Sequence, residues 1–257
     1  MIFLLERRGE AGVELSYHQK RKNMKISIKI ALFVFASALI ISCSQEDPGP
    51  QQNEHQSFSI LDFDRLEVAD AMDVTVIEGN TFSVLARGDR RNLNDLKIYK
   101  DGSTLVAKYS VNRNRQYTTY LTITMPALHG FDFSGAVTGR VEDFDEEARM
   151  DVSLSGASVA QVNCEASEIY INLTGASQLR LSGEGKKADA TISGASSLSA
   201  FDFPVDEAKL IVTGASQARI NASAKLVVTA SGASDVLYRG APQMESDVTG
   251  ASTLKKD

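Results

Sequence analysis

The chain has 257 residues and a formal net charge of −6, with 43% hydrophobic residues, no tryptophan and two cysteines. From Cys43 onward there are 20 Lys and Arg against 30 Asp and Glu, which gives a net charge of −10. An acidic chain gains nothing from the electrostatics of a phosphate backbone, so this charge argues against nucleic acid as a partner.

The first coherent feature along the chain is a targeting segment. Lys25 and Lys29 precede an apolar run over residues 30–41, which is short for a bilayer span and ends at small residues. Ile40-Ile41-Ser42-Cys43 resembles the end of a bacterial lipoprotein signal. This resemblance implies cleavage before Cys43, lipidation of Cys43 and attachment to a membrane through the lipid. An ordinary signal peptide followed by an unrelated cysteine is the alternative.

The targeting segment sets the first boundaries. We expect residues 24–42 to form the signal peptide, Met24 to be the true start, and residues 1–23 to be a non-native extension. If Cys43 carries lipid, Cys164 has no cysteine with which to form a disulfide. The fold must then depend on burial and on its hydrogen-bonded strands.

A polar stretch follows the signal. Residues 43–57 contain Pro48, Pro50 and several polar residues, and they are predicted to form a flexible spacer. Glu46 and Asp47 resemble the signal by which some Bacteroidetes-type bacteria send lipoproteins to the outer face of the outer membrane. A solvated spacer would explain these two acids as well.

Residues 58–130 are rich in predicted strands. Residues 73–76 and 82–85 flank Gly79-Asn80, and residues 96–99 and 104–107 flank a turn at Asp101-Gly102. Both arrangements are typical of hairpins. A further strand over residues 120–125 ends at Pro126, where a sheet loses a hydrogen-bond donor. We therefore predict an antiparallel β region that caps whatever follows it.

Residues 131–257 contain a short phrase that recurs seven times. Its form is Ser or Thr, then Gly-Ala, usually followed by Ser, and the intervals between glycines are 21, 19, 19, 20, 18 and 18 residues. The glycines are Gly135, Gly156, Gly175, Gly194, Gly214, Gly232 and Gly250. Such a period is typical of an array in which each unit buries its apolar side against its neighbours.

The apolar positions around each glycine lie at even offsets, as Val152, Leu154, Ala160 and Val162 do around Gly156. A period of two indicates a strand with one buried face, with the glycine pointing inward and the following serine stacked inside. If the chain turned at the glycine, this parity would break. The predicted fold is all-β: a right-handed parallel β-helix of about seven coils of 18–21 residues, preceded by the antiparallel cap.

A catalytic set is hard to assemble from these residues. Glu147 and Glu168, twelve residues after their glycines, form the best carboxylate pair for a carbohydrate-active enzyme, although Glu147 also belongs to an acidic loop. His129 is expected in a turn, and Cys164 is expected to be a packed thiol. We predict no metal site and no cofactor.

The outward positions before the glycines suggest a binding strip of hydroxyl groups. Its predicted residues are Ser155, Thr174, Ser193, Thr213, Ser231 and Thr249. The strip could dock a flat partner or a second copy of the chain, or it could be the solvent side of a repetitive sheet.

The strand-rich segment, Met125-Pro126-Ala127-Leu128 and the Ser-Gly-Ala phrases behind a lipoprotein signal resemble the family called putative auto-transporter adhesin, head GIN domain. The resemblance implies a right-handed β-helix and a place in the cell envelope, and it assigns no catalytic residues.

We therefore expect an outer-membrane lipoprotein, on the cell surface or the periplasmic face, that binds a glycan or a surface protein and is not an enzyme. A carbohydrate-active enzyme using Glu147 and Glu168 and a self-associating envelope scaffold are the alternatives.

Overall fold

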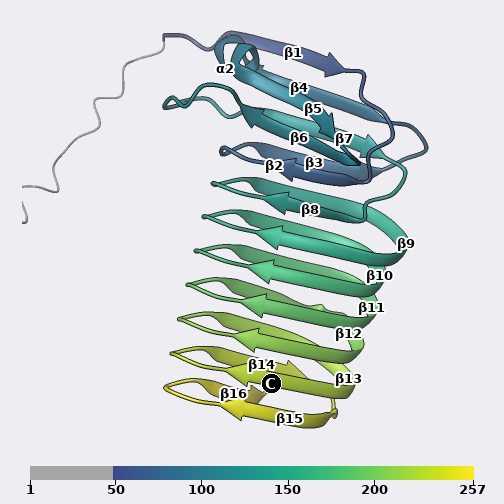
Figure 1. Ribbon diagram of the computed structural model, residues 1–257, viewed down its shortest axis with the longest axis vertical. Coiled ribbons are helices and arrows are strands. Elements are labelled where there is room, and N and C mark those ends of the chain that lie inside the picture. Colours follow the sequence, from purple (N-terminus) through teal and green to yellow (C-terminus); the bar gives the residue numbers. More distant parts are fainter. Residues whose placement is uncertain (1–48) are drawn as a thin grey trace, which may run out of the picture. The chain divides into compact units, whose positions relative to one another are not determined.

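The computed structural model describes residues 49–257, except for the side chain of Glu146, and these residues form a β-solenoid of about seven turns (Figure 1). The predicted extension, the signal peptide and Cys43 lie outside the described residues. Within the described part, no helix has the length and apolar character needed to cross a membrane. The right-handedness of the coil stays a prediction.

The described part contains one short helix, α2 (Arg90–Asp95), and a series of strands. The strands are β1 (Asn53–Phe58), β2 (Arg65–Val68), β3 (Asp73–Glu78), β4 (Ser83–Asp89), β5 (Leu96–Asp101), β6 (Thr104–Tyr109), β7 (Tyr120–Met125), β8 (Gly130–Phe133), β9 (Thr138–Leu154), β10 (Val159–Leu173), β11 (Gln178–Ile192), β12 (Ser197–Val212), β13 (Gln217–Ala230), β14 (Asp235–Arg239), β15 (Gln243–Val248) and β16 (Thr253–Lys256).

Each long strand from β9 to β13 forms most of one coil (Figure 1). It leaves a sharp turn, runs along one face, bends, and returns along the opposite face to the next turn. We call these the post-turn face and the pre-turn face. The post-turn face is continuous from end to end, in the strand order β1-β4-β7-β3-β9-β10-β11-β12-β13-β14-β16. The pre-turn face contains β5, β6, β2 and β8, then the second parts of β9 to β13, and β15.

The repeated glycines lie in the sharp turns, and the prediction that they point inward from mid-strand is wrong. They are exposed, and their φ angles lie between 71° and 84°. A Cβ added to Gly214 would lie 2.5 Å from the carbonyl oxygen of Gly194 in the preceding coil. The alanine after each glycine continues the stack, as when the Ala215 N–H donates to Gly194 O at 2.8 Å. Glycine is therefore required both for the left-handed backbone and for the close approach of successive turns.

The serine that follows each turn is buried, as predicted. Ser158, Ser177, Ser196, Ser216 and Ser234 are at most 1% exposed. In three of these coils the hydroxyl donates to the carbonyl of the residue three positions earlier, at 2.7 to 2.9 Å. The buried serine hydroxyl therefore has a hydrogen-bond acceptor within its own turn. This explains why serine follows Gly-Ala in the repeated phrase.

The apolar side chains fill the space between the two faces. The predicted inward positions are buried from Val152 and Leu154 through to Val236. At the bend, Phe144 and Phe203 fill the core, and the Phe203 ring occupies the space beside Gly185. Unequal coil lengths are absorbed near the bend, where β9 makes two register shifts against β10.

The cap differs from the prediction in one of its two hairpins. The β5–β6 hairpin is confirmed, with Asp101 opposite Thr104. The hairpin between residues 73–76 and 82–85 is wrong, because β7 lies between β3 and β4, parallel to the first and antiparallel to the second. Local turn residues could not reveal this partner from further along the chain.

The solenoid also starts earlier than predicted. Strand β2 pairs in parallel with β8, and β3 pairs in parallel with β9. Between them, Asp70 and Ala71 have φ angles of 69° and 57°, so they make the turn that glycine makes in later coils. At the N-terminal end, residues 53–57 of the predicted flexible spacer belong to β1, which pairs with β4.

Candidate binding surface

The predicted strip of hydroxyl residues lies along the edge formed by the sharp turns. Its six members are stacked coil upon coil, and the backbone N–H of Ser193 donates to Leu173 O in the preceding coil at 2.9 Å. All except Thr249 are only partly exposed, whereas the glycines and alanines beside them are exposed. The strip therefore presents a narrow edge of backbone, methyl groups and half-covered hydroxyls.

Sheet pairing does not place the two predicted carboxylates opposite each other. Glu147 lies opposite Ala166, and Glu168 lies opposite Arg149, because the two register shifts in β9 move Glu147 out of line with Glu168. The Glu147 side chain is turned inward, is 8% exposed, and accepts a hydrogen bond from the Leu128 N–H at 2.9 Å. Glu168 accepts one from the Tyr170 hydroxyl at 2.9 Å. Each carboxylate thus has a separate structural contact.

The remaining candidates for chemistry are also held by structural contacts. Cys164 is buried, as predicted, and burial raises the pKa of its thiol to about 12. His129 follows β7 outside any strand, and its Nδ1 lies 3.2 Å from Asp64 Oδ2. Burial alone would raise the pKa of Asp64, but hydrogen bonds from Ser103 and His129 outweigh it and lower that pKa. No three metal-ligating side chains gather anywhere in residues 49–257.

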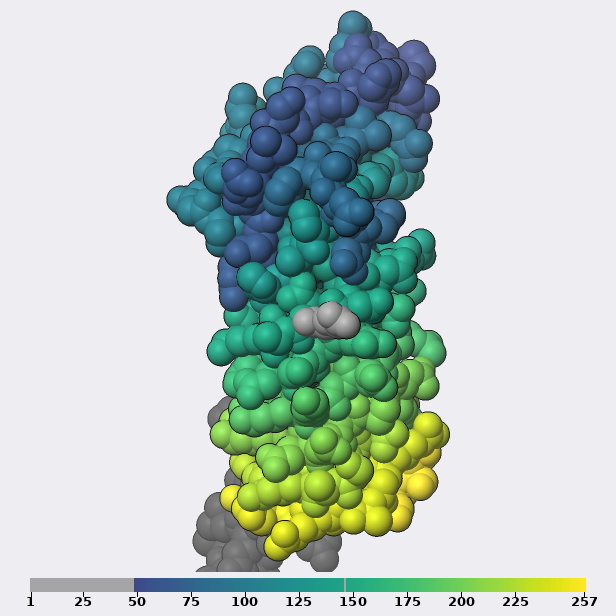
Figure 2. Space-filling view, turned by 90° about the vertical axis from the view of Figure 1, so that its right-hand side faces the viewer, coloured from purple at the N-terminus to yellow at the C-terminus, as the bar shows by residue number. Residues whose placement is uncertain are grey.

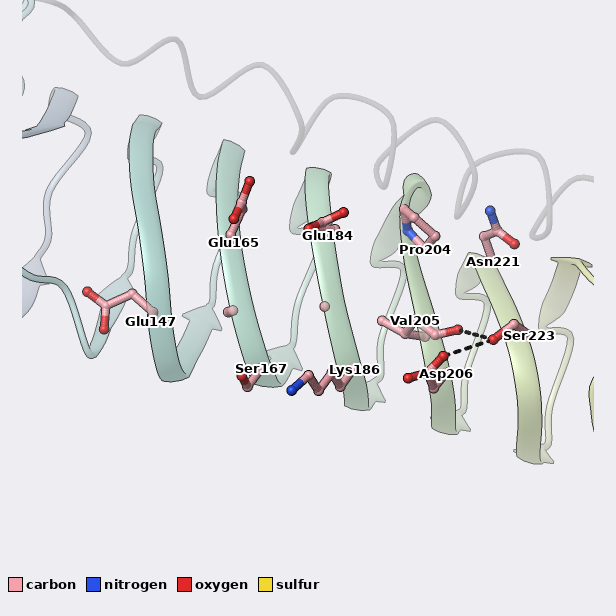
Figure 3. A pocket seen from close by; sticks show the side chains of 12 residues that line it. Glu147, Glu165, Ser167, Glu184, Lys186, Pro204, Val205, Asp206, Asn221 and Ser223 are labelled. Atoms are coloured by element: carbon pink, nitrogen blue, oxygen red, sulfur yellow. Dashed lines mark hydrogen bonds between the residues drawn. The ribbon is translucent and has the colours of Figure 1, made fainter.

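A groove crosses successive coils at the bend (Figure 3), on the side of the molecule that faces the viewer in Figure 2. Its exposed walls include Glu165, Glu184, Lys186 and Asp206. Glu165 lies directly opposite Glu184 on the neighbouring strand, an arrangement of like charges that weakens a sheet slightly. The groove is therefore acidic, and it offers an anionic ligand little attraction.

The post-turn face carries a different column of side chains. Sheet pairing places one residue of each coil in a single file, five positions after each glycine. We call this file the arginine column, and its residues are Arg140, Gln161, Arg180, Ser199, Arg219, Leu237 and Lys255. It contains four basic residues and no acidic one. The arginines occupy every second coil, so about 9.6 Å separates them along the stack.

The basic groups of the arginine column are open to solvent. The side chains of Arg140 and Arg180 are 57% and 68% exposed, and each has an exposed carboxylate nearby, Glu142 at 3.5 Å and Asp202 at 3.3 Å. Within residues 49–257, Arg219 makes no ion pair. Exposed pairs of this kind contribute roughly 0–1 kcal/mol, so a ligand can replace them at little cost.

The pre-turn face carries a column in which the charges alternate. Its members, opposite one another on successive strands, are Arg149, Glu168, Lys187, Glu207 and Lys225. Every charge therefore has an opposite charge beside it, about 4.8 Å away along the stack. The pre-turn column therefore alternates basic and acidic residues, whereas the arginine column alternates basic and neutral residues and finds its carboxylates, Glu142 and Asp202, outside the column.

Arg149 extends this network toward the cap. It donates to Asp151 Oδ1 at 2.9 Å, and its guanidinium lies 4.1 Å from the centre of the Tyr170 ring. Asp151 also accepts from Arg65 of β2 at 2.7 Å. Burial alone would raise the pKa of Asp151, but these hydrogen bonds from Arg65 and Arg149 lower it. The contacts join the first coils to one another.

Sequence reasoning did not single out the arginine column, although its signal is present. Counting five residues after each glycine gives Arg140, Arg180 and Arg219 in alternate repeats. The period of two predicts that this position faces outward, whereas the residues of the repeated phrase itself have structural roles in the turn.

The fold and these surfaces define a β-solenoid whose features are open faces and shallow grooves. The family model described as putative auto-transporter adhesin, head GIN domain, matches residues 62–242, and the chain belongs to this family. The predicted resemblance is therefore confirmed. A search of curated protein sequences returned no match.

Solved structures from Bacteroides and Parabacteroides species share this fold. A putative adhesin from Bacteroides fragilis superposes with a TM-score of 0.74 at 15% sequence identity, over 81% of this chain and 98% of that chain. A putative adhesin from Parabacteroides merdae gives 0.61 at 16% identity, over 80% and 96%. A putative lipid binding protein from Parabacteroides distasonis gives 0.66 at 14% identity, also over 80% and 96%. At these identities the likeness establishes the fold alone.

Proposed function

We propose that the protein is a lipid-anchored outer-membrane protein whose solenoid serves as a non-catalytic adhesin. The observation that carries this proposal is the post-turn face, which runs without interruption through eleven strands and exposes a file of basic groups that contains no acidic residue. A long, open sheet can contact an extended partner at many points at once. Membership of the adhesin-like family supports the same conclusion.

The anchor is proposed from the sequence alone. Cys43 follows an apolar signal and precedes the described solenoid, so lipid on Cys43 would tether the β1 end of the molecule to a membrane. The acidic Glu46 and Asp47 beside it support export to the outer face. This arrangement would place the coils away from the membrane, where a partner can reach both faces.

The test compares cells that carry the gene, cells that lack it, and cells with Cys43→Ala. We expect protease or antibody to reach the wild-type protein on intact cells, and attachment to a glycan-coated or protein-coated surface to fall without it. The Cys43→Ala protein should leave the membrane fraction. Protein that is protected from protease until the outer membrane is broken would refute the surface adhesin.

A further inference from the structure

We propose that the arginine column binds a linear acidic polysaccharide that carries one carboxylate per disaccharide and lies along the solenoid axis. This inference rests on the proposed function and names its ligand class. Polymer and column would run in the same direction, across the strands of the post-turn face. Each successive carboxylate would meet the next guanidinium.

The spacing of the column carries the argument. Gln161 separates Arg140 from Arg180 by sheet pairing, and Ser199 separates Arg180 from Arg219 in the same way. The Cα atoms of the arginines therefore recur about every 9.6 Å, at twice the distance between strands, and their exposed side chains can place the guanidinium groups at the same period. A polymer with a carboxylate on alternate sugars repeats its charge over two sugar rings. A rigid sheet holds this period over several coils, which a loop could not do.

The chemistry of the column suits carboxylates. Guanidinium groups can hold a carboxylate by two parallel hydrogen bonds. The residues between the arginines are neutral, and Gln161 and Ser199 can hydrogen-bond to the hydroxyls of the intervening sugars. No acid lies in the column to repel the polymer, although the chain as a whole is acidic.

Shallow grooves lie along the same face, between the basic residues. One is lined by Arg140, Glu142, Gln161, Asn163 and Arg180, and another by Arg219, Asp235, Thr253 and Lys255. Their walls supply amide and hydroxyl groups beside the charges. A sugar ring that lies across two strands would therefore find polar partners on either side of the column.

The experiment uses hyaluronan, whose only charges are carboxylates on alternate sugars, and its carboxyl-reduced form as the neutral match. The purified full-length protein is compared with two triple variants of equal charge change. One removes the column charges (Arg140→Gln, Arg180→Gln, Arg219→Gln), and the control removes pre-turn charges (Lys187→Gln, Lys209→Gln, Lys225→Gln). Circular dichroism confirms that both variants are folded, as expected for side chains that are exposed or, at Lys225, half-exposed.

We expect the wild type to bind hyaluronan and to ignore the reduced polymer. Because each charge-assisted contact is worth several-fold in affinity, the column variant should bind at least about tenfold more weakly, and the control should stay within about twofold. A hyaluronan hexasaccharide, with three carboxylates, should bind more tightly than a tetrasaccharide, with two. Affinity should fall as salt rises.

Three results would overturn the inference: no binding of hyaluronan by the wild type, equal losses in the two variants, or equal binding of duplex DNA, which would indicate general attraction to polyanions. These failures can be told apart from failure of the proposed function. If cells still attach through the protein while the purified protein does not bind hyaluronan, the adhesin stands and the ligand class is wrong.

Discussion

The two faces of the solenoid are built from the same strands, yet they treat charge in opposite ways. On the pre-turn face, Arg149, Glu168 and Lys187 place opposite charges on neighbouring coils. On the post-turn face, Arg140 and Arg180 are separated by a neutral residue. The comparison teaches that stacking does not need charge pairing on every face. One face alternates charges of opposite sign from coil to coil, and the other alternates basic and neutral residues, which leaves exposed guanidinium groups that a partner can reach.

Both faces depend on the register that the glycine turns impose, so the largest effect should come from the turns. Gly214→Ala places a Cβ 2.5 Å from Gly194 O, at a φ of 80°. The left-handed backbone costs roughly 1–2 kcal/mol and the overlap with rigid backbone about as much again, so we expect a loss of about 3 kcal/mol in the free energy of unfolding. Denaturant titration measures it.

Gly102→Ala is the matched control for the turn. Gly102 also has a positive φ, of 60°, but a Cβ there meets nothing within 4 Å. Gly102→Ala should lower the free energy of unfolding by about 1–2 kcal/mol, from the left-handed backbone conformation alone. Equal losses for the two substitutions would mean that the close approach between turns contributes nothing.

The alternating column of the pre-turn face gives the next effect. Glu207→Lys puts three like charges side by side with Lys187 and Lys225. Two attractive pairs become repulsive, so we expect a loss of about 1 kcal/mol that shrinks in high salt. Thermal unfolding at two salt concentrations measures it. Glu207→Gln should cost about half as much; a loss independent of salt would show that the column does not act through charge.

A single substitution should give the post-turn face the alternating charges of the pre-turn face. Ser199→Glu inserts an acid between Arg180 and Arg219, which should stabilise the fold by about 0.5 kcal/mol and weaken hyaluronan binding. Ser199→Gln, which adds bulk without charge, is the control for both measurements. If Ser199→Glu bound hyaluronan as tightly as the wild type, the positive charge of the arginine column would not be responsible for binding.

The smallest effect concerns the pH dependence of stability. The pKa of Asp151 is lowered from its ordinary value of 3.8, so its contribution is present above that value and is lost as the pH falls through the folded-state pKa. Asp151→Asn should therefore be less stable than the wild type at neutral pH, and the difference should shrink in acid. Arg65→Gln should behave in the same way, and the double variant should add little. A difference that stays constant with pH would contradict this account.

Much of the solenoid could be predicted from the sequence, because the coil period and the even offsets are local. The buried serines are predicted on that basis, and the β5–β6 hairpin is predicted from its Asp101-Gly102 turn. The glycine was misplaced because Leu154 and Ser158 keep the same parity across the turn while Gly156 faces solvent. A turn was expected to break the alternation of inward and outward residues. The positive φ of the glycine lets the chain turn while the residues on both sides keep that alternation.

The site was harder to predict for two physical reasons. Coil length reveals that β9 has extra residues, but not that its shifts lie on either side of Cys164, and this moved Glu147 away from Glu168. The arginine column could be read by counting from the glycines, but its contrast with the pre-turn face required the pairing of every strand. Long-range pairing, as of β7 with β3 and β4, leaves no local signal.

The most direct test is a crystal structure of the protein with a hyaluronan octasaccharide. We predict that the saccharide lies across the strands of the post-turn face, with successive carboxylates at the guanidinium groups of Arg140, Arg180 and Arg219. Saccharide bound along the turn edge at Ser193 and Thr213, or in the bend groove at Glu184, would contradict the account.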